Sequence, residues 1–143
     1  MTAEKLATMQ QISANLNSST SPVVLVVDDD RAVRNSLVFS LQIEGFAARS
    51  YRGPQELLAE PALPKRGCLI LDYKLPGMTG LQLLGVLRDR HVSLPALLIT
   101  THPSLALRQE AAHAGVLVVE KPLLGEALID AVRHAIAHVQ RSA

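Results

Sequence analysis

The sequence of 143 residues lacks the features that would place the protein in a membrane or an oxidising compartment. Its single cysteine, Cys68, cannot form an internal disulfide, so a reducing compartment is the natural expectation. No apolar run approaches the roughly 20 residues that cross a bilayer. The N-terminus also lacks the basic and then apolar order of a signal peptide. These absences predict a cytoplasmic protein that contacts no membrane.

Excess charge of one sign is missing as well. The formal net charge is +1, which offers no electrostatic attraction for nucleic acid, so we expect no direct nucleic-acid binding. Hydrophobic residues make up 48% of the chain, enough for a full core, and the length suits one domain. We expect a folded domain over residues 22–143. Residues 1–21 end in a Ser, Asn and Thr run, which predicts an N-terminal extension that is a linker or a short helix.

Strand patterns alternate with helix patterns through residues 22–143. Continuous apolar runs predict strands that are buried on both faces, and they lie at 23–27, 68–71, 95–99 and 116–119. A weaker strand at 46–50 is typical of a position near a sheet edge. Each strand is followed by a helical pattern, the last over about 125–140. This alternation predicts a doubly wound α/β fold with a five-stranded parallel sheet.

Polar side chains stand where the apolar strands end. Asp28 and Asp29 follow the first strand, and Asp72 follows the third. Thr100 and Lys121 come at the ends of the fourth and fifth strands. In doubly wound sheets, ligands bind beyond the carboxyl ends of the strands, so we expect these five side chains to converge on one edge.

The acidic side chains at this edge predict a bound cation. Residues 28–30 are three aspartates in a row, and two unit charges about 4 Å apart repel by roughly 4 kcal/mol at an effective dielectric constant near 20. Carboxylates and a hydroxyl, without a nearby His or Cys ligand, suit a hard ion such as Mg²⁺ or Mn²⁺. Asp30 is better interpreted as the cap of the following helix. A cation among carboxylates does not by itself identify a reaction.

Four motifs resemble the receiver domain of bacterial two-component response regulators. They are "VVDDDRAVRNSL", "LILDYKLPGMTGLQLL", "LLITTH" and "VVEKPL", and the resemblance covers about residues 22–140. The separations of Asp28, Asp72, Thr100 and Lys121, which are 44, 28 and 21 residues, fit the family. The sequence is most similar to receivers of LuxR-type regulators. The resemblance implies the flavodoxin-like (βα)5 fold of that family.

The same resemblance implies a metal site. Asp28 and Asp29 correspond to the acidic pair, with Asp29 as a direct Mg²⁺ ligand and Asp28 acting largely through water. Asp72 is a further ligand, and the backbone carbonyl of Lys74 completes the shell. Mn²⁺ is the expected substitute ion.

A signalling role follows from the remaining matches. Asp72 corresponds to the phosphoacceptor, Thr100 to the residue that hydrogen-bonds the phosphoryl group, and Lys121 to the residue that pairs with a phosphoryl oxygen. The implied partner is a sensor histidine kinase or a histidine phosphotransfer protein, and the domain would catalyse only its own phosphorylation and dephosphorylation. A homodimer through residues 100–121 and the last helix is a further expectation.

Two alternatives stay open at this point. The first is a degenerate receiver that acts as a phosphorylation-independent interaction module, because Val118 replaces the usual aromatic residue and Thr101 replaces a small one. The second is a haloacid-dehalogenase-like phosphotransferase in which Asp28, as the first residue of an Asp-x-Asp motif with Asp30, is the nucleophile. That interpretation leaves Asp72 without a role.

Overall fold

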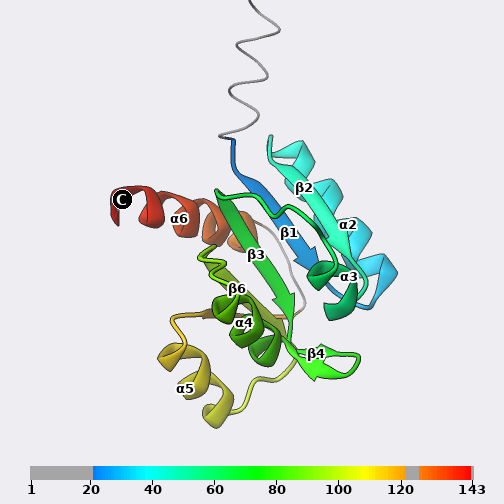
Figure 1. Cartoon of the computed structure of the whole chain (residues 1–143), viewed down its shortest axis with the longest axis vertical. Helices are drawn as coiled ribbons and strands as arrows, with labels where there is room; N and C mark the ends of the chain where they lie inside the picture. The colour runs from blue at the N-terminus through cyan, green and yellow to red at the C-terminus, as the bar shows by residue number, and fades with distance from the viewer. Residues whose placement is uncertain (1–20, 122–125, 143) are drawn as a thin grey trace, which may run out of the picture.

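Five parallel strands form the centre of the computed structural model, which describes residues 21–121 and 126–142 (Figure 1). The strand order is β2-β1-β3-β6-β7. The strands are β1 (Val23–Val27), β2 (Ala47–Tyr51), β3 (Gly67–Asp72), β6 (Ala96–Thr100) and β7 (Leu117–Glu120). The helices are α2 (Arg31–Ile43), α3 (Pro54–Leu58), α4 (Gly80–Asp89), α5 (Leu105–His113) and α6 (Ala127–Ser142). The predicted doubly wound fold is therefore confirmed.

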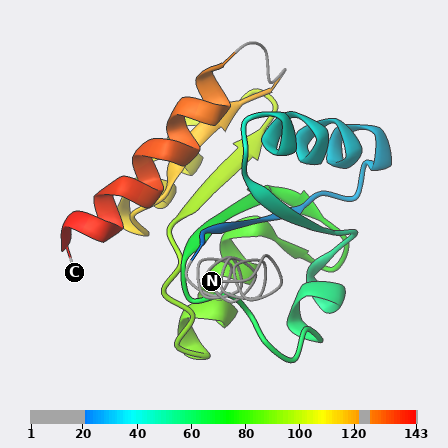
Figure 2. The ribbon, with the colours of Figure 1, turned by 90° about the horizontal axis from the view of Figure 1, so that it is seen from above.

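Helices cover both faces of the sheet. α2 and α6 lie on one face, and α3 and α4 lie on the other (Figure 2). α5 packs in the same core as α3 and α4. Successive side chains of β1 alternate between the two cores, so Leu25 packs in the core with α4 while Val26 packs in the core with α2. Burial on both faces explains why the central strands are continuous apolar runs in the sequence. Among the described residues, no helix is long and apolar enough to span a bilayer.

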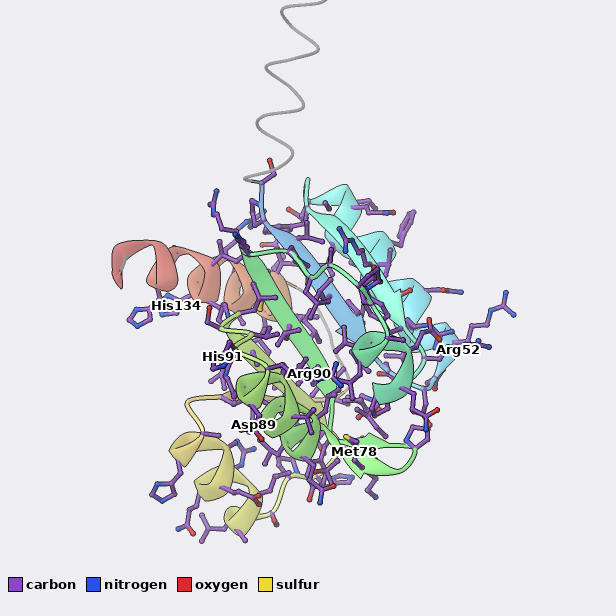
Figure 3. The ribbon with its side chains drawn as sticks, viewed as in Figure 1. Arg52, Met78, Asp89, Arg90, His91 and His134 are labelled. Carbon is purple, nitrogen blue, oxygen red and sulfur yellow. The ribbon has the colours of Figure 1, made fainter. Side chains whose placement is uncertain are left out.

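The predicted strands match the observed ones to within a residue or two, and β2 lies at the sheet edge as expected. The predicted extension falls almost wholly outside the described residues, so the domain boundary stays a prediction. One element was not predicted, a hairpin of β4 (Lys74–Leu75) and β5 (Met78–Thr79), in which Met78 is labelled in Figure 3. Its strands of two residues are too short to show a period, and Gly77, with φ of +84°, forms the turn.

Three helices, α2, α4 and α5, end in the same way. The residue that leaves each helix has a positive φ, which is 91° at Gly45, 64° at His91 and 72° at Gly115. The next N–H then donates to a carbonyl five residues earlier, as Val92 does to Leu87 at 3.0 Å. This is the Schellman arrangement, in which glycine is the usual residue at the left-handed position. After α4, His91 occupies this left-handed position in place of glycine; it is labelled in Figure 3.

Replacing His91 by glycine is expected to stabilise the domain by about 0.5–1 kcal/mol, because glycine adopts a positive φ without the steric cost of a Cβ atom. Urea unfolding of His91→Gly and the wild type measures the difference. Gly45→Ala is the matched opposite change and should destabilise by a similar amount, since no atom lies within 4 Å of its added Cβ and only the φ penalty remains. Equal stabilities of His91→Gly and the wild type would contradict the prediction.

Candidate functional site

Three carboxylates meet at the carboxyl ends of the adjacent central strands β1 and β3. Asp28 directly follows β1, and Asp72 is the last residue of β3. One carboxylate oxygen from each of Asp28, Asp29 and Asp72 lies within 4.8 Å of the others. Asp28 and Asp72 are buried, whereas Asp29 is exposed. The predicted acidic cluster is therefore assembled where the strand order of the sheet reverses, which is where α/β sheets bind ligands.

Asp28 is held by its backbone and by one side-chain oxygen. Its N–H donates to the Tyr51 carbonyl at 3.2 Å, and its own carbonyl accepts from Arg34 Nη1 at 2.8 Å. Its Oδ1 accepts from the backbone N–H of Asp30 at 2.9 Å. Its Oδ2 is buried and has no hydrogen-bond partner within the described ranges. A buried carboxylate oxygen without a donor is costly unless a cation satisfies it.

Lys121 provides the positive charge of the cluster. Its Nζ lies 3.4 Å from Asp28 Oδ2 and 3.4 Å from Asp72 Oδ2. Among the side chains described in residues 21–121 and 126–138, no other basic group lies within 4.0 Å of these two carboxylates. One ammonium thus faces the carboxylates of Asp28, Asp29 and Asp72, which leaves the cluster with excess negative charge.

The remaining predicted site residues lie at the same edge of the sheet. Thr100 is buried at the end of β6, and its carbonyl accepts the N–H of Lys121 at 2.7 Å. Its neighbour Ile99 pairs with Asp72 across β3 and β6. Lys74 is exposed at the start of β4, two residues after Asp72. The roles predicted for the Thr100 hydroxyl and the Lys74 carbonyl stay predictions.

Asp30 lies outside the metal-ligand cluster. Its Oδ1 accepts from the backbone N–H groups of Ala32 and Val33 at 2.9 and 3.3 Å, which makes it the N-cap of α2. The predicted capping role is confirmed. A carboxylate that caps a helix is poorly placed to act as the second residue of an Asp-x-Asp nucleophile motif, and this observation disfavours Asp28 as a nucleophile.

Arg34 was not among the residues predicted for the site. It is 8% exposed and lies on the inner face of α2 together with Leu37 and Leu41, three and seven residues later. That spacing is the signal that could have found it, because an arginine in the apolar stripe of a helix faces the interior. Its guanidinium bonds the Asp28 carbonyl, so it belongs to the surroundings of the acidic cluster.

The electrostatics of the cluster shift two pKa values. Burial, and then the charge of Asp28, raises the pKa of the Asp72 carboxyl from 3.8 to about 6, although Lys121 opposes the change. Burial alone would lower the pKa of Lys121, but the charges of Asp28 and Asp72 outweigh it and raise that pKa overall. Lys121 is therefore charged at neutral pH, and ionising Asp72 costs more in the folded protein than in the unfolded chain.

The charge on Asp72 is expected to cost stability as the pH rises. A carboxyl whose pKa is raised in the fold holds its proton more tightly there than in the unfolded chain, so stability falls between its ordinary pKa of 3.8 and the folded value of about 6. Asp72→Asn removes the charge. Its stability advantage over the wild type should be small at pH 4 and reach about 1–2 kcal/mol at pH 7 without divalent ions.

Urea unfolding in EDTA at pH 4, 5, 6 and 7 measures this difference. Asp89→Asn is a matched control, since Asp89 is an exposed carboxylate at the end of α4 and should give only a few tenths of a kcal/mol. An advantage of Asp72→Asn that stays constant from pH 4 to pH 7 would argue against the effect of the Asp72 charge.

The donor set of the cluster suits a hard divalent ion. It offers carboxylate oxygens from three residues, one of them with a buried oxygen that no hydrogen bond satisfies. Mg²⁺ prefers oxygen ligands and usually keeps several waters, so a cluster with one exposed carboxylate is compatible with it. The residues present therefore fit Mg²⁺ at this position.

The comparisons with known proteins agree with the observed fold. Residues 24–133 match the family described as response regulator receiver domain. Transcriptional regulatory protein FixJ of Rhizobium meliloti (strain 1021) is 34% identical over 121 residues, which cover 84% of this chain and 59% of that protein. C4-dicarboxylate transport transcriptional regulatory protein DctR of Rhodobacter capsulatus is 38% identical over 117 residues, which cover 80% of this chain and 59% of that protein. The chain thus spans about three fifths of these relatives.

A solved structure shows the same likeness. Response regulator protein TrrA from Thermotoga maritima, solved in complex with Mg(2+)-BeF, is 25% identical and has a TM-score of 0.68. The match covers 80% of this chain and 98% of that one. The matched family spans most of the chain, and the predicted acidic cluster is present at the expected edge of the sheet. The chain therefore belongs to the family of receiver domains of two-component response regulators.

Proposed function

We propose that Asp72 accepts a phosphoryl group from a sensor histidine kinase or a histidine phosphotransfer protein, and that phosphorylation changes the binding of a partner. Receiver domains of response regulators are phosphorylated by histidine kinases. The observation that carries the proposal is the contact of a buried carboxylate at the end of β3 with Lys121 Nζ at 3.4 Å, beside the acidic pair. A nucleophile and a cation are thus adjacent at a sheet edge where ligands bind.

Asp28, Asp29 and Asp72 would hold Mg²⁺ or Mn²⁺, with the backbone carbonyl of Lys74 as a further ligand. Such an ion, when bound, neutralises negative charge on the oxygens of a transferring phosphoryl group. Two observations support the assignment. Among the described residues, the buried Asp28 Oδ2 has no hydrogen bond, and it shares Lys121 Nζ, 3.4 Å away, with Asp72. The similar protein TrrA was solved in complex with Mg(2+)-BeF.

The protein groups perform the transfer chiefly by positioning. An Asp72 carboxylate oxygen forms the new O–P bond while the bond from phosphorus to the donor's imidazole nitrogen breaks, so no water and no redox partner is needed. Lys121 is charged at neutral pH and would pair with a phosphoryl oxygen. Thr100 would donate its hydroxyl to another oxygen, a hydrogen bond strengthened by the phosphoryl charge.

The surface that would report phosphorylation lies over residues 100–121. Two large apolar side chains are exposed there, Leu105 on α5 at 72% and Leu117 on β7 at 57%. Leu105 begins α5 and Leu117 begins β7, and large apolar side chains with this exposure can take part in a contact surface. This supports a homodimer or partner contact through α5 and β7, in a protein that acts in the cytoplasm.

The proposal is tested by incubating the chain with acetyl phosphate and Mg²⁺ and measuring the intact mass. We expect the addition of one phosphoryl group, and none in EDTA. Unmodified protein with Mg²⁺ would favour the degenerate receiver, which Val118 and Thr101 suggest. Modification at an equal rate in EDTA would contradict the metal site.

A further inference from the structure

Arg34 is a buried charge for which the phosphoryl-transfer chemistry has no use. In the described part of the chain, the buried polar and charged residues are Asp28, Arg34, Asp72 and Thr100. The other three are the predicted site residues at the sheet edge. A guanidinium loses much of its hydration on burial, and an apolar side chain usually stabilises an interior position at least as well. Arg34 therefore calls for an explanation other than core packing.

The guanidinium of Arg34 binds a peptide group rather than an acid. Its Nη1 donates to the backbone carbonyl of Asp28 at 2.8 Å, and no carboxylate of a described residue lies within 4.0 Å of it. Charge neutralisation by direct contact is therefore the function of Lys121, not of Arg34. The charged donor makes this a strong hydrogen bond to a neutral carbonyl.

The peptide that Arg34 holds is the one between the two members of the acidic pair. Its carbonyl belongs to Asp28, and its nitrogen belongs to Asp29. Turning this peptide about the Cα–C bond of Asp28 would move the Asp29 Cα atom, and the Asp29 side chain would move with it. The Asp28 side chain is fixed separately by the N–H of Asp30 at 2.9 Å. Arg34 thus acts on the part of the turn that sets the direction of Asp29.

We propose that Arg34 is a positioning residue of the metal site: it holds the peptide between Asp28 and Asp29 so that both carboxylates face the same ion. The inference rests on the proposed function, since it requires a divalent ion at this cluster. The hydrogen bond of Arg34 is to the Asp28 carbonyl and not to a carboxylate, so Arg34 acts through the acidic pair. Groups that orient metal ligands typically change metal affinity 10- to 100-fold when they are removed.

The test is the affinity for Mn²⁺, measured by the loss of the free-ion EPR signal during titration of the purified chain. Arg34→Met keeps an apolar stem like that of arginine but removes the guanidinium donors, and we expect the Kd to rise about tenfold or more. Arg34→Lys keeps a charged donor and should recover part of the affinity. Urea unfolding of each variant gives its stability independently.

Arg88→Met is the matched control. Arg88 also donates to backbone carbonyls, those of Val92 at 2.8 Å and Leu94 at 2.7 Å, but these precede β6 at the other end of the sheet. Arg88→Met should lower the free energy of unfolding and leave the Kd for Mn²⁺ unchanged. The comparison separates a loss of affinity from a general loss of stability.

Each outcome decides between the alternatives. The inference is supported if the Kd for Mn²⁺ rises in Arg34→Met, rises less in Arg34→Lys and does not change in Arg88→Met. Wild-type binding of Mn²⁺ together with an unchanged Kd in Arg34→Met overturns this inference alone. A wild type that binds no Mn²⁺ overturns the metal site of the proposed function and this inference with it. Should Arg34→Met not fold, Arg34→Gln is the second variant, because its shorter, uncharged side chain has lost the reach and the charge of the guanidinium. An unchanged Kd in Arg34→Gln would overturn the inference.

Discussion

Asp72→Asn is expected to abolish the uptake of a phosphoryl group from acetyl phosphate. The amide that replaces the carboxylate has no anionic oxygen to form the acyl phosphate, so no slower version of the same reaction remains. The same variant should be more stable than the wild type at neutral pH. Intact mass after incubation with acetyl phosphate and Mg²⁺ measures the uptake, and fragmentation of the wild type should place the added group on Asp72.

Asp30→Asn is the matched control for this change. It neutralises an aspartate of the same acidic run, but Asp30 caps α2 and asparagine is an equally good cap. This variant should fold and take up a phosphoryl group as the wild type does. Uptake that persists in Asp72→Asn, or that maps to Asp28, would instead support the Asp-x-Asp phosphotransferase.

Gly67→Ala is expected to destabilise the domain by about 3 kcal/mol or more. Gly67 starts β3 with φ of +148°, and a Cβ atom there would lie 1.9 Å from the carbonyl oxygen of Val23. Val23 is its partner in the β1–β3 register. Because the contact is with backbone, no side chain can move aside, and the two strands would have to separate at this end. Urea unfolding measures the loss.

Gly85→Ala is the control, and its expected change in stability has the opposite sign. Gly85 lies inside α4, and its added Cβ would meet no atom within 4 Å. Alanine is the better helix former, so this variant should be more stable than the wild type by about 0.5–1 kcal/mol. Equal free energies of unfolding for Gly67→Ala and Gly85→Ala would contradict the prediction. They would show that the contact of an added Cβ atom at position 67 with the Val23 carbonyl does not destabilise the fold.

The sequence was informative where a residue's position depends on local pattern. The apolar run before Asp28 predicts β1 because only a strand covered on both faces is apolar at every position. The cap at Asp30 was predictable because the side chain bonds N–H groups two and three residues away. The convergence of Asp28, Asp72 and Lys121 followed from the strand order of the fold class.

The features that were missed depend on distances that no local pattern contains. The β4–β5 hairpin has strands of two residues, below any detectable period. His91 ends α4 at a position where glycine is the usual signal. The contact of Arg34 with the Asp28 carbonyl depends on how α2 packs across the end of β1, which only the assembled fold determines.

The hydrogen bond of 2.7 Å between the Lys121 N–H and the Thr100 carbonyl joins the ends of two neighbouring strands. β6 and β7 are also paired along their length, with Thr100 opposite Glu120. A displacement of the backbone at either strand end therefore carries the other with it. The Thr100 hydroxyl and the Lys121 ammonium, which would contact a phosphoryl group, are thus attached to a pair of strands that moves together. The outer strand of this pair, β7, carries the exposed Leu117.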